Sequence, residues 1–426
     1  MTQHKSGGTL LAFIGWCFIA SMTLYPTPDS AVSNSFSSPW CLVCGDLGVI
    51  DVTLNCLLFL PLGLGLGLRS TSRWRAVALI VGTTMIVEFL QLHLIPGRDA
   101  SLSDLITNTI GGIAGFALAS RWRPVLFPES KTSLRLASLG AVLWILVQTF
   151  TAFAMNLRLP ESVYYGQWAP DLAQFQKFTG RVQSAELNGA PLPGSQLPGS
   201  PEIRSQLLSG SSHVVVRAMT GKVTSALAPI FSIYDENQRE VLLLGQSHTD
   251  IIFRIRTRSA ALLLRGPSIR LTDVLPELPG LPFEVRATVR PGHYQLVADI
   301  GGRTIQRELS ASASWGWSLI LPFDHAFGSE MRWLTMLWLA GLLLPIGYYA
   351  GRSQRVNLFF AAVSLAVLLV LGLIVVPRVS GLAGGEISEW IAACLGTVSG
   401  WWLGRRSLHE SLARERPASP SFARSQ

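Results

Sequence analysis

Seven polar side chains stand in otherwise apolar surroundings early in the chain, and their types could support chemistry. They are Asp51, Asn55, Glu88, Gln91, Arg98, Asp104 and Asn108. A carboxylate can act as a general acid or base, and an arginine can hold a phosphate or another carboxylate through two parallel hydrogen bonds. Glu88, Asp104 and Arg98 are therefore the candidate catalytic residues, and all seven are candidate binding residues.

The spacing of these residues places them on helix faces. The pairs at helical spacing are Asp51 with Asn55, Glu88 with Gln91, and Asp104 with Asn108. Arg98 follows Glu88 in a short connection and is its expected partner, because an unpaired charge in the apolar part of a bilayer costs about 2.5–3.5 kcal/mol. Asp104 is placed to cap the next helix, where the helix dipole favours a negative group.

A second interpretation of the same residues is a polar staple without chemistry. In that interpretation Asp104 is a cap, Gln91 and Asn108 form interhelical hydrogen bonds, and Arg98 clamps Glu88. Two or more carboxylates converging beside an arginine exceed what a staple requires, which favours a functional site. Both interpretations stay open from the sequence.

Membrane helices are the elements that must position this set. The chain has 426 residues, of which 49% are hydrophobic and 14% charged, and its mean hydropathy is +0.38, as is typical of a polytopic membrane protein. Apolar runs near the roughly 20 residues that cross a bilayer predict eight spans. They lie at about 9–25, 52–68, 75–95, 104–120, 134–156, 331–350, 357–376 and 387–404.

The distribution of Lys and Arg predicts the orientation of these spans. Basic residues cluster in the loops on one side, whereas the opposite short loops carry only Arg98 and Arg378. By the positive-inside rule, both termini are cytoplasmic and residues 157–330 lie outside. The net charge of +8 is then a topology signal rather than a sign of nucleic-acid binding.

The cysteines predict no metal site and no cofactor. Cys41 and Cys44 fall in an outer loop, where a disulfide is permitted, but no nearby histidine supplies further metal ligands. Whether this pair is oxidised stays open.

Between the fifth and sixth spans, residues of about 160–325 alternate apolar and polar positions in short runs broken by Gly, Pro and Asn. Seven runs predict strands, at 213–220, 229–237, 240–246, 250–258, 261–266, 283–290 and 294–302. Such a series predicts a two-sheet antiparallel sandwich. The segments FTGRVQSAELNG at 178–189 and APIFSIYDENQREVLLLGQSHTDIIFRIRT at 228–257 resemble concanavalin A-like and laminin-G-like jelly rolls.

That resemblance implies carbohydrate binding for the sandwich. Five aromatic residues could stack on sugars or, alternatively, could belong to the core or the membrane interface. They are Trp168, Tyr234, Tyr294, Trp315 and Trp317.

The helices also contain an internal similarity. LPLGLGLGLRSTSRWRAVALIVG at 60–82 aligns at a shift of 284 with residues 344–366, and SDLITNTIGGIAGFALASR at 103–121 aligns one residue further on with 388–406. The glycines and basic loop recur, whereas Glu88 falls on Leu373 and Asp104 survives as Glu389. The sixth to eighth spans are interpreted as a degenerate copy of the second to fourth, with chance similarity between Gly-rich helices as the alternative.

The polar set, in its order along the chain, resembles the VanZ-like membrane proteins. The matching pattern is D-x3-N-x3-F-x-P-x-G in DVTLNCLLFLPLG, E-x2-Q in EFLQ, the loop arginine Arg98, and D-x3-N-x2-G in DLITNTIG. The resemblance covers residues of about 10–120. It implies that the seven residues are the polar core of the family, and it implies a link to glycopeptide antibiotic resistance at the cell envelope.

These observations predict a polytopic helical membrane protein with an inserted sandwich. The expected parts are a VanZ-like domain at 1–125, a fifth helix at 126–158, the sandwich at 159–328, the copied helices at 329–406 and a disordered cytoplasmic tail at 407–426. The leading hypothesis is binding or processing of a lipid-linked or surface glycan at an outer-leaflet polar pocket in the cytoplasmic membrane. The alternatives are a non-catalytic envelope scaffold whose sandwich docks a glycan or protein and, third, a small transporter; the oligomeric state is not predicted.

Overall fold

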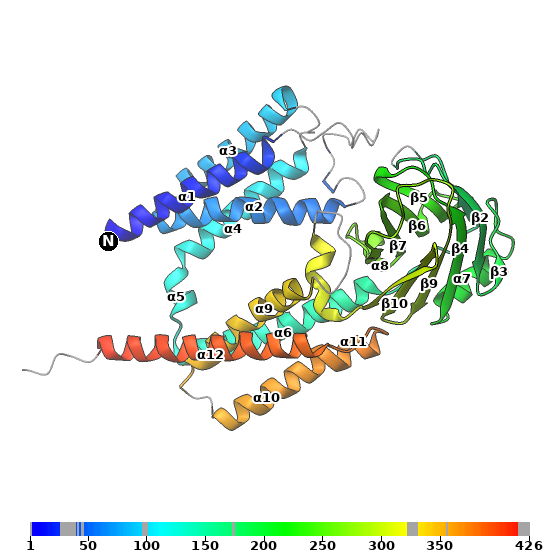
Figure 1. The fold of residues 1–426 in the computed structure, drawn as a ribbon. Helices are drawn as coiled ribbons and strands as arrows, with labels where there is room; N and C mark the ends of the chain where they lie inside the picture. Colours follow the sequence, from blue (N-terminus) through cyan, green and yellow to red (C-terminus); the bar gives the residue numbers. More distant parts are fainter. Residues whose placement is uncertain are drawn as a thin grey trace, which may run out of the picture.

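The protein is a bundle of long helices with a β domain at one end (Figure 1). The computed structural model describes residues 2–25, 40, 42–43, 47–95, 101–172, 175–321, 331–354 and 357–415. Within these residues, seven helices are long and apolar enough to cross a membrane. The eighth predicted span lies in α12 (Ile387–Glu415), which carries Glu389 and is not among the seven. The chain is a helical membrane protein with a β domain.

The first group of helices forms around an apolar core that includes Ile19, Phe59 and Ile80. Its members are α1 (Thr2–Thr23), α2 (Gly48–Leu68), α3 (Arg73–Leu94) and α4 (Leu102–Ser120). Helices α2 and α4 approach so closely that a Cβ atom on Gly63 would lie 1.9 Å from the carbonyl oxygen of Gly112. Small residues are needed at such a contact, because lipid supplies no hydrophobic drive between helices and close packing must stabilise them.

A second group of helices follows the short helix α5 (Trp122–Leu126) and has its own core around Trp144, Leu343 and Leu373. Its members are α6 (Ser130–Met155), α9 (Arg332–Arg352), α10 (Leu358–Val370), the π-helical turn η4 (Leu371–Val375), α11 (Val376–Val379) and α12. The π turn places Gly372 against the ring of Trp144, which fits there only because Gly372 has no side chain.

Each helix group has its closest helix–helix contact at a position that the internal similarity aligns with the other group. Gly63 faces the carbonyl oxygen of Gly112, and a Cβ atom on the aligned Gly347 would lie 2.0 Å from the carbonyl oxygen of Thr397. Helix α6 also takes the place that α1 has in the first group. A Cβ on Gly15 of α1 would meet the backbone of Leu62, and one on Gly140 of α6 would meet Ile346, the residue aligned with Leu62.

The β domain contains two antiparallel sheets that enclose one apolar core. The five-stranded sheet has the order β1 (Tyr164–Trp168), β5 (Thr224–Asp235), β6 (Glu240–His248), β7 (Asp250–Ile255) and β8 (Ser268–Leu271). The six-stranded sheet has the order β11 (Arg303–Ser310), β10 (His293–Ile300), β9 (Pro282–Arg290), β4 (Ser212–Met219), β2 (Arg181–Leu187) and β3 (Ala190–Pro191). Alternating burial along β4 and β9 explains the period-two pattern of their sequences.

One predicted strand is wrong. Residues 261–266 form the end of α8 (Arg258–Ala261) and a turn in which Leu263 has a φ of 55°. A short apolar run cannot by itself distinguish a strand from a turn that packs one side against a core. Helix α7 (Ser200–Leu208) was likewise not anticipated within the Pro- and Gly-rich connection.

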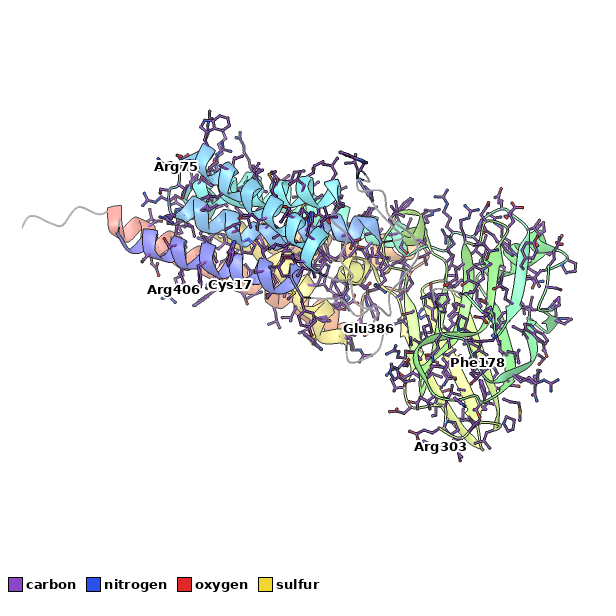
Figure 2. All side chains as sticks on the ribbon, turned by 90° about the horizontal axis from the view of Figure 1, so that it is seen from above. Cys17, Arg75, Phe178, Arg303, Glu386 and Arg406 are labelled. Carbon is purple, nitrogen blue, oxygen red and sulfur yellow. The ribbon has the colours of Figure 1, made fainter. Side chains whose placement is uncertain are left out.

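Backbone pairing ties the β domain to the second group of helices. Leu157 forms an antiparallel bridge with Thr257, and Ser312 forms a parallel bridge with Ala383. The 3₁₀ segment η2 (Ala313–Ile320) packs on α6, where a Cβ on Gly316 would lie 2.6 Å from the hydroxyl of Thr151. Figure 2 shows Arg75 and Arg406 at the end of the helices far from the β domain and Glu386 near the junction.

Candidate polar site in the membrane

Asp51, Asn55 and Asp104 lie at the end of the first helix group that faces the β domain. Ile50, next to Asp51, is buried in the apolar core that continues into that domain. The amide nitrogen of Asn55 donates to the Oδ1 atom of Asp104 at 2.5 Å, which joins α2 to α4. The charge of Asp104 also acts on Asp51 and Glu88, so three carboxylates share one electrostatic neighbourhood.

Glu88 holds the start of α4. Its Oε2 atom accepts the backbone N–H of Ser101 at 3.1 Å. Ser101 is the N-cap residue, because its hydroxyl accepts the backbone N–H of Asp104 at 3.0 Å. Asp104 was expected to be the cap; instead it is three residues inside, and its carboxylate is directed to Asn55.

Gln91 and Asn108 form interhelical hydrogen bonds, as the staple interpretation predicts. The Gln91 amide donates to the carbonyl oxygen of Thr23 in α1 at 3.0 Å, and the Asn108 amide donates to the hydroxyl of Thr84 in α3 at 3.0 Å. Both side chains are buried, and the Oδ1 atom of Asn108 has no partner among the described residues. These two residues hold helices together, so they belong to the support of the site.

Two predicted features lie outside the described residues. Arg98, the expected partner of Glu88, is one, and the Cys41–Cys44 pair is the other. The remaining six residues of the polar set are described, and hydrogen bonds or charge interactions connect each of them to a neighbouring helix or to Asp104.

The described cluster is rich in acceptors. An ionised carboxylate has no hydrogen to donate, so it attracts hydroxyl or ammonium donors and repels phosphate. No group of three His, Cys, Asp or Glu residues in the described part of the chain is placed to hold a metal ion. The arrangement is therefore suited to binding a donor-rich group, such as a polyol.

The aligned position in the second helix group shows what such a carboxylate binds. Glu389, which aligns with Asp104, is 3% exposed and accepts the hydroxyls of Ser312 and Ser314 at 2.6 and 2.8 Å. Nearby, the indole of Trp317 donates to the hydroxyl of Thr335 at 3.0 Å. The chain's own segment 312–317 thus packs against Glu389 and Thr335 in the second helix group.

Sequence reasoning missed this second cluster although a signal was present. The alignment identified Glu389 as the surviving acid, but its partners come from a segment about 75 residues earlier. The run SASASWGW offers hydroxyl donors, and only the fold brings it to α12.

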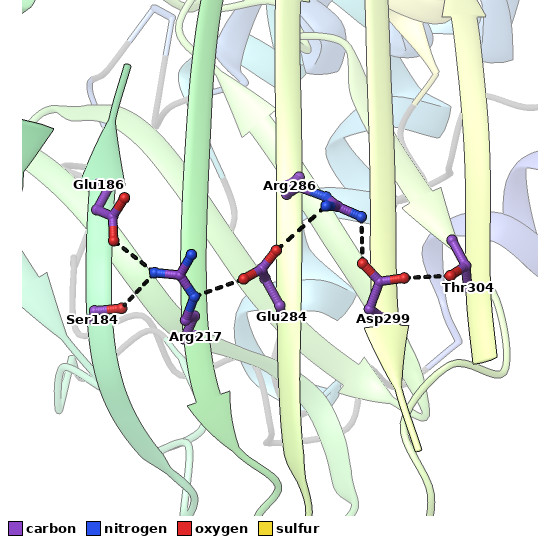
Figure 3. A network of polar contacts seen from close by, with 7 residues as sticks. All are labelled: Ser184, Glu186, Arg217, Glu284, Arg286, Asp299 and Thr304. Carbon is purple, nitrogen blue, oxygen red and sulfur yellow. Dashed lines mark hydrogen bonds and ion pairs between the residues drawn. The ribbon is translucent and has the colours of Figure 1, made fainter. Parts of the chain in front are cut away.

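The exposed face of the six-stranded sheet carries a ladder of charges on β2, β4, β9 and β10, which Thr304 extends to β11 (Figure 3). Arg217 donates to Glu186 and Glu284, each at 2.6 Å, and these hydrogen bonds raise its pKa above the ordinary value. Arg286 continues the ladder to Asp299, which accepts the hydroxyl of Thr304. The face is polar and internally paired.

Four of the five aromatic residues considered for sugar stacking are buried. Tyr234, Tyr294, Trp315 and Trp317 are at most 7% exposed, whereas Trp168 is 37% exposed. The core interpretation therefore holds for the four, and Trp168 alone of this set offers a surface to a ligand.

A family model described as VanZ/LLP1 matches residues 11–123. This range includes most of α1, all of α2 to α4 and every residue of the polar set. No curated protein and no solved structure matches the chain. Residues 11–123 are thus the VanZ-like part of a longer membrane protein.

Proposed function

We propose that the VanZ-like part binds the hydroxyl groups of a cell-envelope glycan or lipid-linked saccharide at the cluster of Asp51, Glu88 and Asp104. The β domain, a jelly roll in this proposal, lies on the outer side of the cytoplasmic membrane and receives or presents the same glycan. Membrane lipids surround the helices. The family resemblance connects this role to glycopeptide resistance.

The observation that carries the proposal is the pair of serine hydroxyls on Glu389. Glu389, at the position aligned with Asp104, accepts hydrogen bonds from two nearby hydroxyls. A carboxylate can accept hydrogen bonds from two neighbouring hydroxyls of a sugar ring in the same way. We interpret the second helix group as a degenerate copy whose site is filled by its own chain. In the first helix group Asp104 accepts from Asn55, and Asp51 beside it is exposed.

The test is saccharide binding by the purified protein in detergent, for the parent and for Asp104→Asn and Glu88→Gln. We expect each variant to lose at least about tenfold in affinity, because a hydrogen bond to a charged group contributes about 1.5–3 kcal/mol. Thermal melting should change little, since the amide oxygen that Glu88→Gln introduces can still accept from Ser101. The exposed Glu277→Gln in the β domain is the matched control and should bind like the parent.

The same variants give a cellular readout at equal expression. If the site serves an envelope glycan, the parent alters susceptibility to a glycopeptide antibiotic, whereas Asp104→Asn does not. A parent that binds no saccharide, or acid variants that melt early without any difference in ligand binding, would leave only the staple interpretation.

A non-catalytic scaffold is the second candidate, and the charged ladder of Figure 3 favours it. Its paired arginines and carboxylates present a flat polar face with few stacking surfaces for sugars, which is suited to a charged polymer or protein. In that case the paired change Arg217→Ala with Arg286→Ala removes the cellular effect, and Asp104→Asn leaves it intact.

A further inference from the structure

An arginine-rich site lies where α6 leaves the membrane and the chain enters the β domain. Two adjoining cavities of about 460 and 530 Å³ share the walls formed by Arg158, Leu159 and Arg204. Three more arginines complete the lining, namely Arg239, Arg256 and Arg258. Glu161 is the one acidic residue among the described residues that line either cavity. The cavities therefore concentrate positive charge at one level of the molecule.

Backbone pairing assembles this cluster. The N–H of Arg158 donates to the carbonyl oxygen of Arg256 at 3.4 Å, and the N–H of Arg258 donates to that of Asn156 at 2.8 Å. The segment after α6 therefore lies antiparallel to the segment after β7. Because this pairing fixes the three arginines on neighbouring backbones, their convergence is a property of the fold.

Part of the positive charge is not neutralised. Arg204 pairs with Glu161 at 2.9 Å, and Arg239 pairs with Asp235 at 2.6 Å. Arg158 and Arg258 have no carboxylate partner among the residues that the structure describes. Two guanidinium groups thus remain to bind an anion.

The cluster lies at the membrane surface. Phe153, two residues before the end of α6, is 45% exposed, as expected of a side chain that faces lipid. The guanidinium of Arg258 lies 4.5 Å from the centre of this ring. A cation at the depth of the last turn of a membrane helix lies among lipid headgroups.

We propose that these cavities bind the phosphate of a membrane lipid headgroup. Arg158 and Arg258 supply the charge and the forked donors that suit a phosphate, and Phe153 lies beside the acyl chains. Among the described residues, the polar cluster in α2 to α4 offers carboxylates, which repel an anion, whereas these cavities offer guanidinium groups. The site is independent of the proposed glycan function and stands if that function fails.

The experiment compares ligands that differ in the phosphate and in the lipid chains. Detergent micelles that contain the full-length protein are titrated with phosphatidylglycerol, with diacylglycerol of the same chains, and with inorganic phosphate in water. We expect binding of phosphatidylglycerol, followed by native mass spectrometry, and no comparable binding of diacylglycerol. Saturation by inorganic phosphate at the same concentrations would identify a soluble anion site and overturn the lipid assignment.

Two double variants test the residues. Arg158→Gln with Arg258→Gln should weaken phosphatidylglycerol binding by about ten- to thirtyfold, since each basic residue near a membrane surface contributes on the order of 1 kcal/mol. Arg158→Lys with Arg258→Lys keeps the charge and should recover most of the affinity. The matched control changes Arg181 and Arg303 to Gln; both are exposed, neither lines these cavities, and Arg303 lies on the β domain away from the helices (Figure 2). If the Arg158→Gln, Arg258→Gln variant binds phosphatidylglycerol as tightly as the Arg181→Gln, Arg303→Gln control, the proposal is overturned.

Discussion

Individual residues of the two polar clusters differ in how completely they are enclosed. Asp104 shares its neighbourhood with Asp51, whose side chain is exposed, whereas Glu389 is buried with two hydroxyl donors. A buried carboxylate that loses its donors keeps the full cost of desolvation. The stability of the junction between helices and β domain should therefore depend strongly on two serines.

The change Ser312→Ala with Ser314→Ala tests this dependence. We expect the free energy of unfolding to fall by about 3 kcal/mol, because two hydrogen bonds to a buried carboxyl group are lost. Adding Glu389→Leu, which removes the buried carboxyl group that has lost both serine donors, should recover part of that loss. The measurement is a denaturant titration in detergent. If adding Glu389→Leu instead lowers the free energy of unfolding by about 3 kcal/mol more, Glu389 is stabilised by other neighbours.

The polar residues were easier to predict than their partners. Glu88 and Gln91 stand out because a polar residue within an apolar helix is rare. The roles of Ser101 as the N-cap and of Ser312 as a hydrogen-bond donor to Glu389 depend on tertiary contacts, which helical periodicity does not encode. Local pattern thus identified which side chains matter, and tertiary packing decided what each one binds.

At the scale of elements, the helix pairs α2 with α4 and α9 with α12 have the same construction. Glycines on each helix press against backbone carbonyl groups of the other. The positions of seven membrane-length helices were readable from the sequence because a bilayer demands about 20 apolar residues. The packing of α6 against α9 could not be predicted from the sequence, because α6 has no run of glycines. Its likeness to α1 is one of position in the fold, not of sequence.

Glycine substitutions should distinguish glycines that are needed at a helix contact from glycines that are not. Gly63→Ala and Gly347→Ala would each place a Cβ within 2.0 Å of a carbonyl oxygen, so the helices must separate, at a cost of about 1–3 kcal/mol or more. Gly82→Ala in α3 and Gly341→Ala in α9 have nothing within 4 Å and should stabilise by up to about 1 kcal/mol. Thermal melting in detergent measures all four. Equal effects at the four positions would contradict the contact geometry.

At the scale of the whole molecule, the helices place their basic ends away from the β domain. Arg75 and Arg406 lie at that far end, where the positive-inside rule puts the cytoplasm (Figure 2). From this rule we predict that the β domain lies outside. The orientation is a prediction from the charges in the loops. The packing of the β domain on α6 and η2 could be seen only in the structure.

Accessibility labelling tests the orientation. In a version without the native cysteines, Arg303→Cys should react with a membrane-impermeant maleimide added to intact cells, because residue 303 is exposed on the β domain. Glu410→Cys, near the end of α12, should react only after the membrane is opened. The reverse pattern would place both termini outside and exclude an outer-leaflet site.

The contact between α6 and α9 also sets an order of assembly during synthesis. Helix α6 ends at Met155 and α9 begins at Arg332, so the whole β domain is made between two helices that pack together. At roughly 5–20 residues per second, α6 waits about 10–35 s for its partner. The first helix group can close during that delay. In the folded protein the buried Gln148 of α6 donates to the carbonyl oxygen of Gly372 at 3.4 Å, so until that partner is made α6 depends on the insertion machinery or on lipid to shield this side chain. Shortening the β domain would hasten this step, and slowing its translation would expose α6 to quality control.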